Sequence, residues 1–543
     1  MSPLTSRQSP VWKDFFLAVI SGVVLSLSFP AANLEFLAWV AFVPLFVCLK
    51  EKSKTKAFLL AYLAGVVFWS FVIYWLVHVT LVGTVLLVLY LAFYFGFFGL
   101  AFSLVTSRPP SAGSSVHDIL SSLLLASAWV VLEYARSHLL TGFPWALLGY
   151  SQYLNLPVIQ IADIFGAWGV SFVVMMVNAC LYSAFAAPRA HDRKDRRVFL
   201  IKTLAVPCVC LAVAAGYGFF ALHRLDKADT RKSIKVAVIQ ANIPQESKWD
   251  PAARGSILEQ YLAISAQSSA SAPDLLVWPE ASLPTIVEDE PRYLGMAAAF
   301  ARSHEVSMLI GAITRRNQMF YNSALLVSSD GTLEAGYDKL HLVPFGEYVP
   351  LKKVLPFLET VVPIGDATPG KDFTIFDVYL GSGPAHSARS RFGVLICFED
   401  VFPELAREFV KRGAHFLVNI TNDAWYKKTS AAEQHFQASV FRAVENRVNV
   451  VRSANTGISG FISPQGKAIS LVEEDGEKIF VAGGRTRELR NPRGMLSIYT
   501  SWGDWFVVAC LIFFWFASGA WRRFCPLCRI ASACGKGKTQ CST

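Results

Sequence analysis

Residues 392–400 read Phe-Gly-Val-Leu-Ile-Cys-Phe-Glu-Asp, an apolar run that ends in a thiol followed by acidic residues. The apolar part has the composition of a buried strand, and Cys397 stands where that strand would end. Of the ten cysteines, only Cys397 lies between residues 224 and 503, so it has no disulfide partner within that segment. The thiol is therefore either a packing residue or a nucleophile.

The composition indicates a membrane protein. Hydrophobic residues make up 53% of the 543 residues and charged residues only 17%, which is too apolar for a soluble enzyme of this size. A membrane-spanning helix needs about 20 mostly apolar residues. About eight segments meet this requirement: 12–29, 33–49, 57–76, 80–105, 119–137, 160–186, 198–221 and 501–521.

This pattern predicts four parts. An N-terminal membrane domain with seven spans is followed by an extramembrane domain with the composition of a globular protein, then by one more span and a short tail. Their boundaries are 1–223, 224–500, 501–521 and 522–543.

The net charge of +10 is explained by where the basic residues lie. Lys and Arg gather in every second loop between the predicted spans and after the last span, whereas the loops near 31–35 and 77–80 have none. Because positively charged loops stay in the cytoplasm, both termini are predicted to be cytoplasmic and residues 224–500 to lie outside. No basic patch interleaved with aromatic residues is present in the sequence, so we expect no nucleic-acid partner.

Residues 224–500 alternate between strand-like and helix-like segments, which predicts an α/β domain. The predicted strands are short β-prone apolar runs at 234–240, 275–278, 308–313, 392–396, 416–420 and 448–453. The predicted helices between them are 252–270, 291–304, 403–412 and 431–447. Residues 351–390 are rich in proline and glycine, and we expect long loops there.

Three segments place a reactive side chain directly after an apolar run. Residues 275–280, Leu-Leu-Val-Trp-Pro-Glu, end in Glu280, and Lys339 lies in a loop bounded by proline and glycine. Cys397 ends the third. Because the ends of strands in α/β domains meet at one edge, these side chains are candidates for a single site.

A glutamate, a lysine and a cysteine form a chemically complete set. A thiol is mostly protonated at neutral pH, so it needs a base or a cationic neighbour to react. Glu280 is suited to accept the thiol proton, and Lys339 to stabilise a thiolate and then the oxyanion of a tetrahedral intermediate. Taken singly, each residue has an equally simple explanation, because Cys397 could be a packing residue and Glu280 or Lys339 a solvated loop residue.

The motifs resemble those of the nitrilase superfamily, whose members use a Glu–Lys–Cys triad in an α-β-β-α sandwich. The resemblance rests on Trp-Pro-Glu at 278–280, on Asp-Lys-Leu-His-Leu-Val-Pro-Phe-Gly-Glu-Tyr-Val-Pro at 338–350 and on Ile-Cys-Phe-Glu-Asp at 396–400. Residues 141–152 and 240–249 make the resemblance more specific. They are similar to motifs of the apolipoprotein N-acyltransferase family, which is the membrane-bound branch of the nitrilase superfamily. The resemblance implies about eight transmembrane helices joined to an extramembrane nitrilase-like domain.

The resemblance also implies a reaction. Glu280 would be the general base, Lys339 the oxyanion stabiliser and Cys397 the nucleophile, which accepts an acyl chain from a membrane phospholipid as a thioester. The α-amine of an S-diacylglyceryl-cysteine at an apolipoprotein N-terminus would then take the chain. The family implies no cofactor, no metal, and a place in the bacterial inner membrane with the catalytic domain facing the periplasm.

Further residues match supporting positions of the family. Glu347 and Glu399 match acidic residues that support the lysine and the cysteine, and Trp249 and Trp425 match aromatic residues near the substrate entrance. Phe398 departs from the family, which commonly has a tyrosine after the nucleophile.

Two other functions remain open from the sequence. A membrane-tethered amidase or nitrilase would use water in place of the amine and would need no membrane groove, and the motif at 142–152 argues against it. A transporter with a regulatory outer domain would carry charged or broken helices at mid-bilayer, of which the spans show few.

Overall fold

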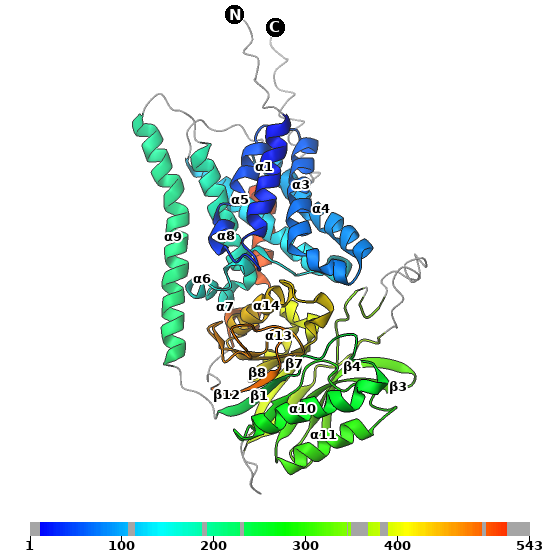
Figure 1. Cartoon of the computed structure of the whole chain (residues 1–543). Helices are drawn as coiled ribbons and strands as arrows, with labels where there is room; N and C mark the ends of the chain where they lie inside the picture. Colours follow the sequence, from blue (N-terminus) through cyan, green and yellow to red (C-terminus); the bar gives the residue numbers. More distant parts are fainter. Residues whose placement is uncertain are drawn as a thin grey trace, which may run out of the picture.

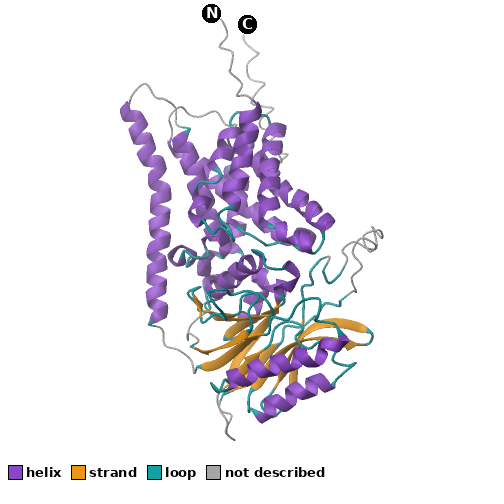
Figure 2. Cartoon of the chain, in the orientation of Figure 1, coloured by secondary structure: helices purple, strands orange, loops and turns teal. Residues whose placement is uncertain are grey.

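The computed structural model describes residues 11–106, 115–186, 193–227, 233–344, 346–348, 367–380, 389–490 and 496–518. In this part of the chain, a bundle of helices stands on one side of a layered α/β body (Figures 1 and 2). The predicted tail 522–543 lies outside the described residues, as does most of the predicted loop region 351–390.

The bundle contains five helices that are long and apolar enough to cross a membrane: Lys54–Val72, Leu81–Thr106, Asp118–Thr141, Ala167–Phe185 and Arg197–Asp226. They belong to α3 (Lys54–Val72), α4 (Leu81–Thr106), α5 (Ser115–His138), α8 (Ala167–Phe185) and α9 (Arg193–Asp226). The remaining predicted spans coincide with shorter helices: α1 (Val11–Ser26), α2 (Val43–Leu49) and α16 (Trp505–Ala517). The predicted total of eight spans therefore stays a prediction.

Two of the predicted spans are broken helices. The segment 160–186 is divided at Gly166, whose φ of +67° is readily adopted only by glycine, so that α7 (Ala162–Phe165) ends before α8 begins. The segment 33–49 is divided into a 3-10 helix, Glu35–Trp39, and α2. Asn178 of α8 satisfies the backbone at this second break, because its side chain accepts from Phe42 N at 2.9 Å and donates to Ala38 O at 2.8 Å.

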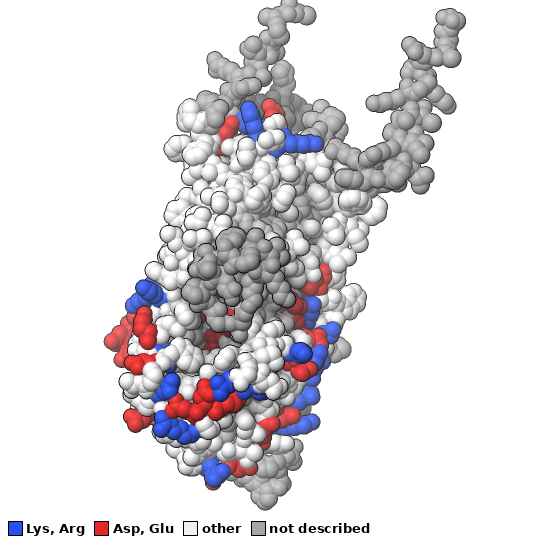
Figure 3. All heavy atoms as spheres, turned by 90° about the vertical axis from the view of Figure 1, so that its right-hand side faces the viewer, with Lys and Arg blue, Asp and Glu red and all other residues white. Residues whose placement is uncertain are grey.

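Charged residues are distributed as a membrane protein requires. On the face drawn in Figure 3, Lys, Arg, Asp and Glu gather over the α/β body, while the described surface of the bundle above it is almost free of them until its far end. The exposed large side chains of the bundle are apolar, for example Leu81, Phe93 and Phe219. An apolar belt between two charged zones is the pattern of a bilayer-embedded bundle.

The α/β body contains two six-stranded sheets. The first has the order β12-β1-β2-β3-β4-β5, and its strands are β1 (Ile234–Gln240), β2 (Leu275–Val277), β3 (Ser307–Arg316), β4 (Met319–Val327), β5 (Leu333–Asp338) and β12 (Gly483–Leu489). The second has the order β11-β10-β9-β8-β7-β6, and its strands are β6 (Ile375–Tyr379), β7 (Arg389–Ile396), β8 (Phe416–Thr421), β9 (Asn449–Ala454), β10 (Gly460–Ile462) and β11 (Ala468–Ile469).

The two sheets pack face to face between two layers of helices. Strand β1 contacts β9, and β4 contacts β7, across the middle of the sandwich. Helices α10 (Arg254–Ser269) and α11 (Arg292–Ser303) cover the first sheet, and α13 (Pro403–Lys411) and α14 (Ala431–Asn446) cover the second (Figure 1). The α13–α14 layer is the one that faces the bundle, so the second sheet is the nearer to it.

All six predicted strands and all four predicted helices of this body are confirmed within a few residues at their ends. Strands β4, β5, β6 and β10–β12 were not predicted. Strand β12 has the sequence Gly-Gly-Arg-Thr-Arg-Glu-Leu, and it forms as an edge strand only because it pairs antiparallel with β1. Strand β6 corrects the expectation of loops throughout 351–390, since it pairs antiparallel with residues 389–393 of β7.

One side chain joins the bundle to the α/β body through all of its hydrogen-bonding groups. The Gln434 Oε1 on α14 accepts from the indole nitrogens of Trp75 at 3.0 Å and Trp145 at 2.8 Å. Its Nε2 donates to the carbonyls of Pro30 and Val72, each at 3.0 Å. These four partners all come from the N-terminal helical part, so Gln434 fixes α14 against it.

We expect Gln434→Leu to destabilise the protein, because two indole N–H groups and two carbonyls lose a buried partner. Each group left unsatisfied costs about 1–3 kcal/mol, so the apparent melting temperature in detergent should fall by roughly 5–10 °C. Gln437→Leu is the matched control: Gln437 is also buried on α14, yet neither side-chain polar atom has a partner among the described residues. Equal losses in the two variants would contradict the role of Gln434.

Candidate active site

Cys397 lies at the point where β7 passes into a five-residue 3-10 helix, Cys397–Val401. Its φ is +53°, in the left-handed region that a residue other than glycine adopts only when its surroundings enforce it. The residue is 8% exposed. The turn places Cys397 at the end of β7, where the sequence left a packing residue and a nucleophile as alternatives, and a strained backbone at a buried thiol favours a functional role.

Glu280 follows β2 and is held by donors on both of its carboxylate oxygens. The Asn322 side chain on β4 donates to Oε1 at 2.7 Å, and the backbone N–H of Asn422 donates to Oε2 at 2.9 Å. The backbone passes so close to Gly311 of β3 that a Cβ there would lie 2.2 Å from Pro279 O. Two donors fix the carboxylate in one orientation, which a general base needs.

Lys339 follows β5 and lies between two carboxylates. Its Nζ is 2.9 Å from both oxygens of Glu347 and 3.6 Å from Glu280 Oε1, and its side chain is 1% exposed. Burial alone would lower the pKa of Lys339, but Glu347 and Glu280 outweigh burial and hold this pKa above its ordinary value. Burial likewise opposes ionisation of Glu347, and Lys339 and Asn322 reverse that effect and lower its pKa. Lys339 therefore remains a cation and Glu347 an anion.

Glu399 ties the lysine segment to the cysteine turn. Its carboxylate accepts from the backbone N–H groups of Leu340 and His341, at 2.6 and 3.1 Å, and from the Tyr337 hydroxyl at 2.9 Å. It also accepts from the N–H of Ile396 at 2.7 Å. Burial raises the pKa of Glu399 to about 7, although these donors favour the ionised form.

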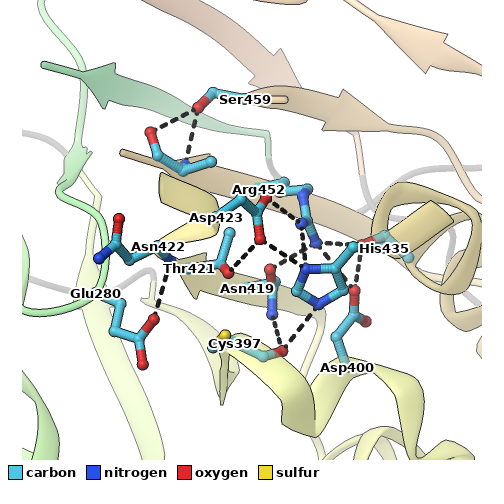
Figure 4. Close-up of polar contacts among 12 residues, drawn as sticks. Glu280, Cys397, Asp400, Asn419, Thr421, Asn422, Asp423, His435, Arg452 and Ser459 are labelled. Atoms are coloured by element: carbon cyan, nitrogen blue, oxygen red, sulfur yellow. Dashed lines mark hydrogen bonds and ion pairs between the residues drawn. The ribbon is translucent and has the colours of Figure 1, made fainter. Parts of the chain in front are cut away.

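Both charged neighbours act on the thiol of Cys397. Burial and the Glu280 carboxylate raise the pKa of the thiol well above its ordinary value, and the Lys339 ammonium partly offsets them. The thiol is therefore protonated at rest, and it needs a base at the moment of attack. Figure 4 shows Glu280, joined to the backbone N–H of Asn422, and Cys397 in the same cluster of side chains. The arrangement suits proton transfer to Glu280 coupled to attack by sulfur.

Two groups in the site were not among the predicted site residues. Asn322 comes from β4, a strand that was not predicted, and it bridges Glu280 and Glu347 by donating to both, at 2.7 and 2.9 Å. Lys248 is 2% exposed, and its Nζ donates to the backbone carbonyl of Glu280 at 3.0 Å. Burial lowers the pKa of Lys248 to about 8, against the charges of Glu280 and Cys397. The tripeptide Ser-Lys-Trp at 247–249 was the available signal for Lys248; nothing comparable marked Asn322.

Phe398, the residue after Cys397, faces the bundle. The Phe398 ring lies 6.4 Å from Trp145, stacked, and 6.3 Å from Phe143, centroid to centroid. Both partners belong to the segment that follows α5, so aromatic side chains of the bundle reach the immediate neighbour of Cys397. The other two sequence candidates, Trp249 and Trp425, are 42% and 53% exposed, which leaves both indoles available for contact with another molecule.

A pocket of about 200 Å³ opens beside Glu347, the partner of Lys339. It is lined by Ile313, Phe320, Tyr321, Asn322, Gly346, Glu347 and Ala367. Among the residues that the structure describes, no group of three or more His, Cys, Asp or Glu side chains is arranged to hold a metal ion. The thiol of Cys397, the carboxylate of Glu280 and the ammonium of Lys339 give the site a nucleophile, a base and a cation.

Comparison with known proteins places these features in a family. Residues 21–180 match the model of the apolipoprotein N-acyltransferase N-terminal domain, and residues 235–485 match that of the carbon-nitrogen hydrolases. Among solved structures, Nit3 of Saccharomyces cerevisiae, a member of branch 10 of the nitrilase superfamily, aligns with 48% of this chain and 91% of its own at 19% identity and a TM-score of 0.35.

Full-length relatives extend over both parts. A protein of Geobacter metallireducens named apolipoprotein N-acyltransferase is 39% identical over 516 residues, which is 92% of this chain and 93% of that protein. A protein of the same name from Methylococcus capsulatus is 29% identical, over 91% of this chain and 93% of its own. The chain described here belongs to the apolipoprotein N-acyltransferase family.

Proposed function

We propose that this protein transfers a fatty acyl chain from a membrane phospholipid to the α-amine of the S-diacylglyceryl-cysteine at an apolipoprotein N-terminus. The observation that carries the proposal is the buried array of Glu280, Lys339 and Glu347 beside Cys397, at the face of the α/β body that meets the apolar bundle. Family membership supports the same reaction, since the full-length relatives bear the name of this activity.

In the first half-reaction, Glu280 takes the thiol proton as Cys397 Sγ attacks the ester carbonyl. The Lys339 ammonium stabilises the resulting oxyanion, and it stays protonated because Glu347 and Glu280 hold its charge. When the tetrahedral intermediate collapses, the ester C–O bond breaks and the proton on Glu280 passes to the departing alkoxide. The products are a lysophospholipid and a thioester on Cys397.

In the second half-reaction, the neutral α-amine of the acceptor attacks the thioester carbonyl. Lys339 again stabilises the oxyanion, and Glu280 accepts a proton from the nitrogen. Breaking the C–S bond releases the thiolate, which regains its proton from Glu280, and the amide product leaves. The kinetics are ping-pong, because the donor product departs before the acceptor reacts.

The place of the site suits lipid substrates. Both substrates are anchored in a bilayer, and the aromatic residues Phe143 and Trp145 bring the bundle next to Phe398. A thioester hydrolyses when water is admitted, so an apolar wall beside the nucleophile favours the amine over water. We infer that the α/β body faces the periplasmic side of the bacterial inner membrane, on the distribution of basic loops.

The acyl-enzyme is the first test. Incubation of the purified protein with phospholipid labelled in its acyl chains should leave a hydroxylamine-sensitive label on the wild type and none on Cys397→Ser. Cys208→Ser is the matched control, since Cys208 is an exposed thiol on α9 that a non-specific reaction would also acylate.

A diacylated lipopeptide should then remove the label and carry it as an amide. Release only as free fatty acid would support the amidase alternative, and retention of the label in Cys397→Ser would contradict the assignment of the nucleophile.

The pH dependence of acylation gives a second test. Because the pKa of Glu399 is near 7, this carboxylate gains a proton as the pH falls through 7, and it then loses acceptor capacity for the N–H groups of Leu340, His341 and Ile396. We expect the wild-type acylation rate to fall below pH 7. Glu399→Gln should be slower by about 10-fold or more and flat between pH 6 and 8, because an amide does not titrate there. A Glu399→Gln variant that keeps the limb near pH 7 would assign that limb to another group.

A further inference from the structure

The backbone carbonyl of Cys397 is bound by two buried side chains that do not touch its sulfur in any described contact. Asn419 Nδ2 on β8 lies 3.2 Å from this oxygen, and His435 Nε2 on α14 lies 3.1 Å from it (Figure 4). Asn419 is 0% and His435 1% exposed. Two donors from two different elements thus converge on the one peptide that the nucleophile's turn must orient.

The other ring nitrogen of His435 meets a buried ionic group. Its Nδ1 is 3.0 Å from Asp423 Oδ1 and 2.9 Å from an Arg452 guanidinium nitrogen. A carboxylate only accepts and a guanidinium only donates, so the two contacts correspond to two protonation states of the ring. In the neutral state Nδ1 accepts from Arg452, and in the cationic state it donates to Asp423. Because Nε2 must donate to the Cys397 carbonyl, it carries its proton in both states.

Arg452 and Asp423, the two charged partners of His435, belong to a larger buried network that includes Asp400. Arg452 on β9 pairs with Asp423 at 3.3 Å and with Asp400 at 3.2 Å, and it donates to Asn419 Oδ1 at 2.8 Å. Ser439 donates to the same Asp400 carboxylate. The arginine and Asp400 are 0% exposed. Arg452 therefore orients both of the side chains that bind the Cys397 carbonyl, His435 through its ring and Asn419 through its amide oxygen.

From this geometry we propose that His435 is a positioning residue that holds the Cys397 peptide, and not a base for the thiol. The inference deepens the acyl-transfer function proposed above and rests on it. A peptide is planar and trans, so fixing the carbonyl of Cys397 toward His435 turns the N–H of Phe398 the opposite way. The same contact keeps Cys397 at its unfavourable φ of +53°. The sulfur and the adjacent N–H are thereby aimed together at the incoming carbonyl carbon and oxygen.

The same helix connects this contact to the bundle. Gln434, the neighbouring residue in the chain, is bound by Trp75, Trp145 and two backbone carbonyls of the helical part. Consecutive residues of α14 therefore hold the bundle and the nucleophile's peptide. The position of His435 is consequently fixed by the helix that carries it, because the contacts of Gln434 hold that helix in place.

The test compares His435→Gln with His435→Asn, two amides that differ by one methylene. The longer amide places its nitrogen near the position of Nε2, where it donates to the Cys397 carbonyl, and its oxygen near Arg452. The shorter amide reaches only the position of Nδ1. Neither amide titrates or accepts the thiol proton, so a base and a positioning residue give different results.

The readout is the burst of p-nitrophenol from a short-chain p-nitrophenyl ester in detergent-solubilised full-length protein, with Gln437→Leu as a control for repacking of α14. We expect His435→Gln to keep the acylation rate constant within about threefold and the wild-type pH profile. His435→Asn should lower the rate constant about 100-fold with an unchanged half-saturating ester concentration, because a small misplacement of the reacting atoms costs this much.

Several results would overturn the proposal. Equal loss in both amide variants, or a pH limb missing from His435→Gln, would make His435 a base, and wild-type rates in both would remove any role. If His435→Asn loses its cooperative thermal transition, Asn419→Ser replaces it, since this variant also lacks one donor to the Cys397 carbonyl. We expect Asn419→Ser to lower the acylation rate constant about 10-fold or more. An unchanged rate constant would contradict the proposal. The ester burst needs no phospholipid, so a wild type that fails to take label from phospholipid but shows this pattern would overturn the proposed function alone.

Discussion

The carboxylate of Glu399 joins two segments that are about 60 residues apart in the chain, and the geometry of the site depends on it. On one side it binds the N–H groups of Leu340 and His341, the two residues that follow Lys339. On the other it binds the N–H of Ile396, the residue before Cys397. Two backbone segments leave their strands here and would each need water for their N–H groups. One buried anion satisfies both, so the cation and the thiol are fixed relative to each other by a single group.

The charged side chains around Lys339 alternate in sign. Glu280, Lys339 and Glu347 alternate in sign over a few ångströms, and Asn322 donates to both carboxylates. An isolated charge at such a depth would be neutralised, whereas their mutual attraction raises the pKa of Lys339 and lowers that of Glu347, so both stay ionised. The thiol of Cys397 is affected in the opposite way: its pKa rises, because burial and Glu280 disfavour the thiolate. The site therefore holds its sulfur as a thiol and its lysine as a cation until a substrate carbonyl arrives.

The sequence predicted the parts of this site that follow apolar runs. Glu280 and Cys397 follow β2 and β7, two strands that composition and periodicity predict. Lys339 follows β5, which was not predicted, so its candidacy rests on the loop bounded by proline and glycine. Asn322 was not predicted because it lies inside β4, where an asparagine is indistinguishable from any polar residue on a strand until its cross-sheet partners are known. His435 was not predicted for a related reason. One polar residue on a helix does not change the periodic pattern of the sequence, and its partners, Cys397 and Asp423, are 38 and 12 residues away in the chain.

The helix breaks in the bundle could not be predicted either, because the groups that stabilise them are distant in the sequence. The composition of residues 160–186 is that of one continuous span, but a single glycine at φ +67° ends one helix and begins another. The backbone groups freed at such a break need partners from elsewhere in the fold. Ala167 N, just after Gly166, donates to Glu445 Oε1 of α14 at 3.0 Å. The broken span is therefore stabilised by the catalytic body, and hydropathy alone contains no information about that partner.

Helix α14 is the element in which these constraints meet. Its residues 434, 435 and 445 bind, in turn, the bundle near Trp75, the peptide of Cys397, and the start of α8 after Gly166. In the acyl transfer proposed above, a thioester needs a wall that excludes water, and a lipid-anchored donor needs a route along the bilayer. The apolar surface of the bundle suits both needs. Since one rigid helix contacts both that surface and the nucleophile, a shift of the bundle relative to the α/β body would also move the Cys397 peptide. The geometry of acyl transfer is in this way coupled to the seating of the membrane domain.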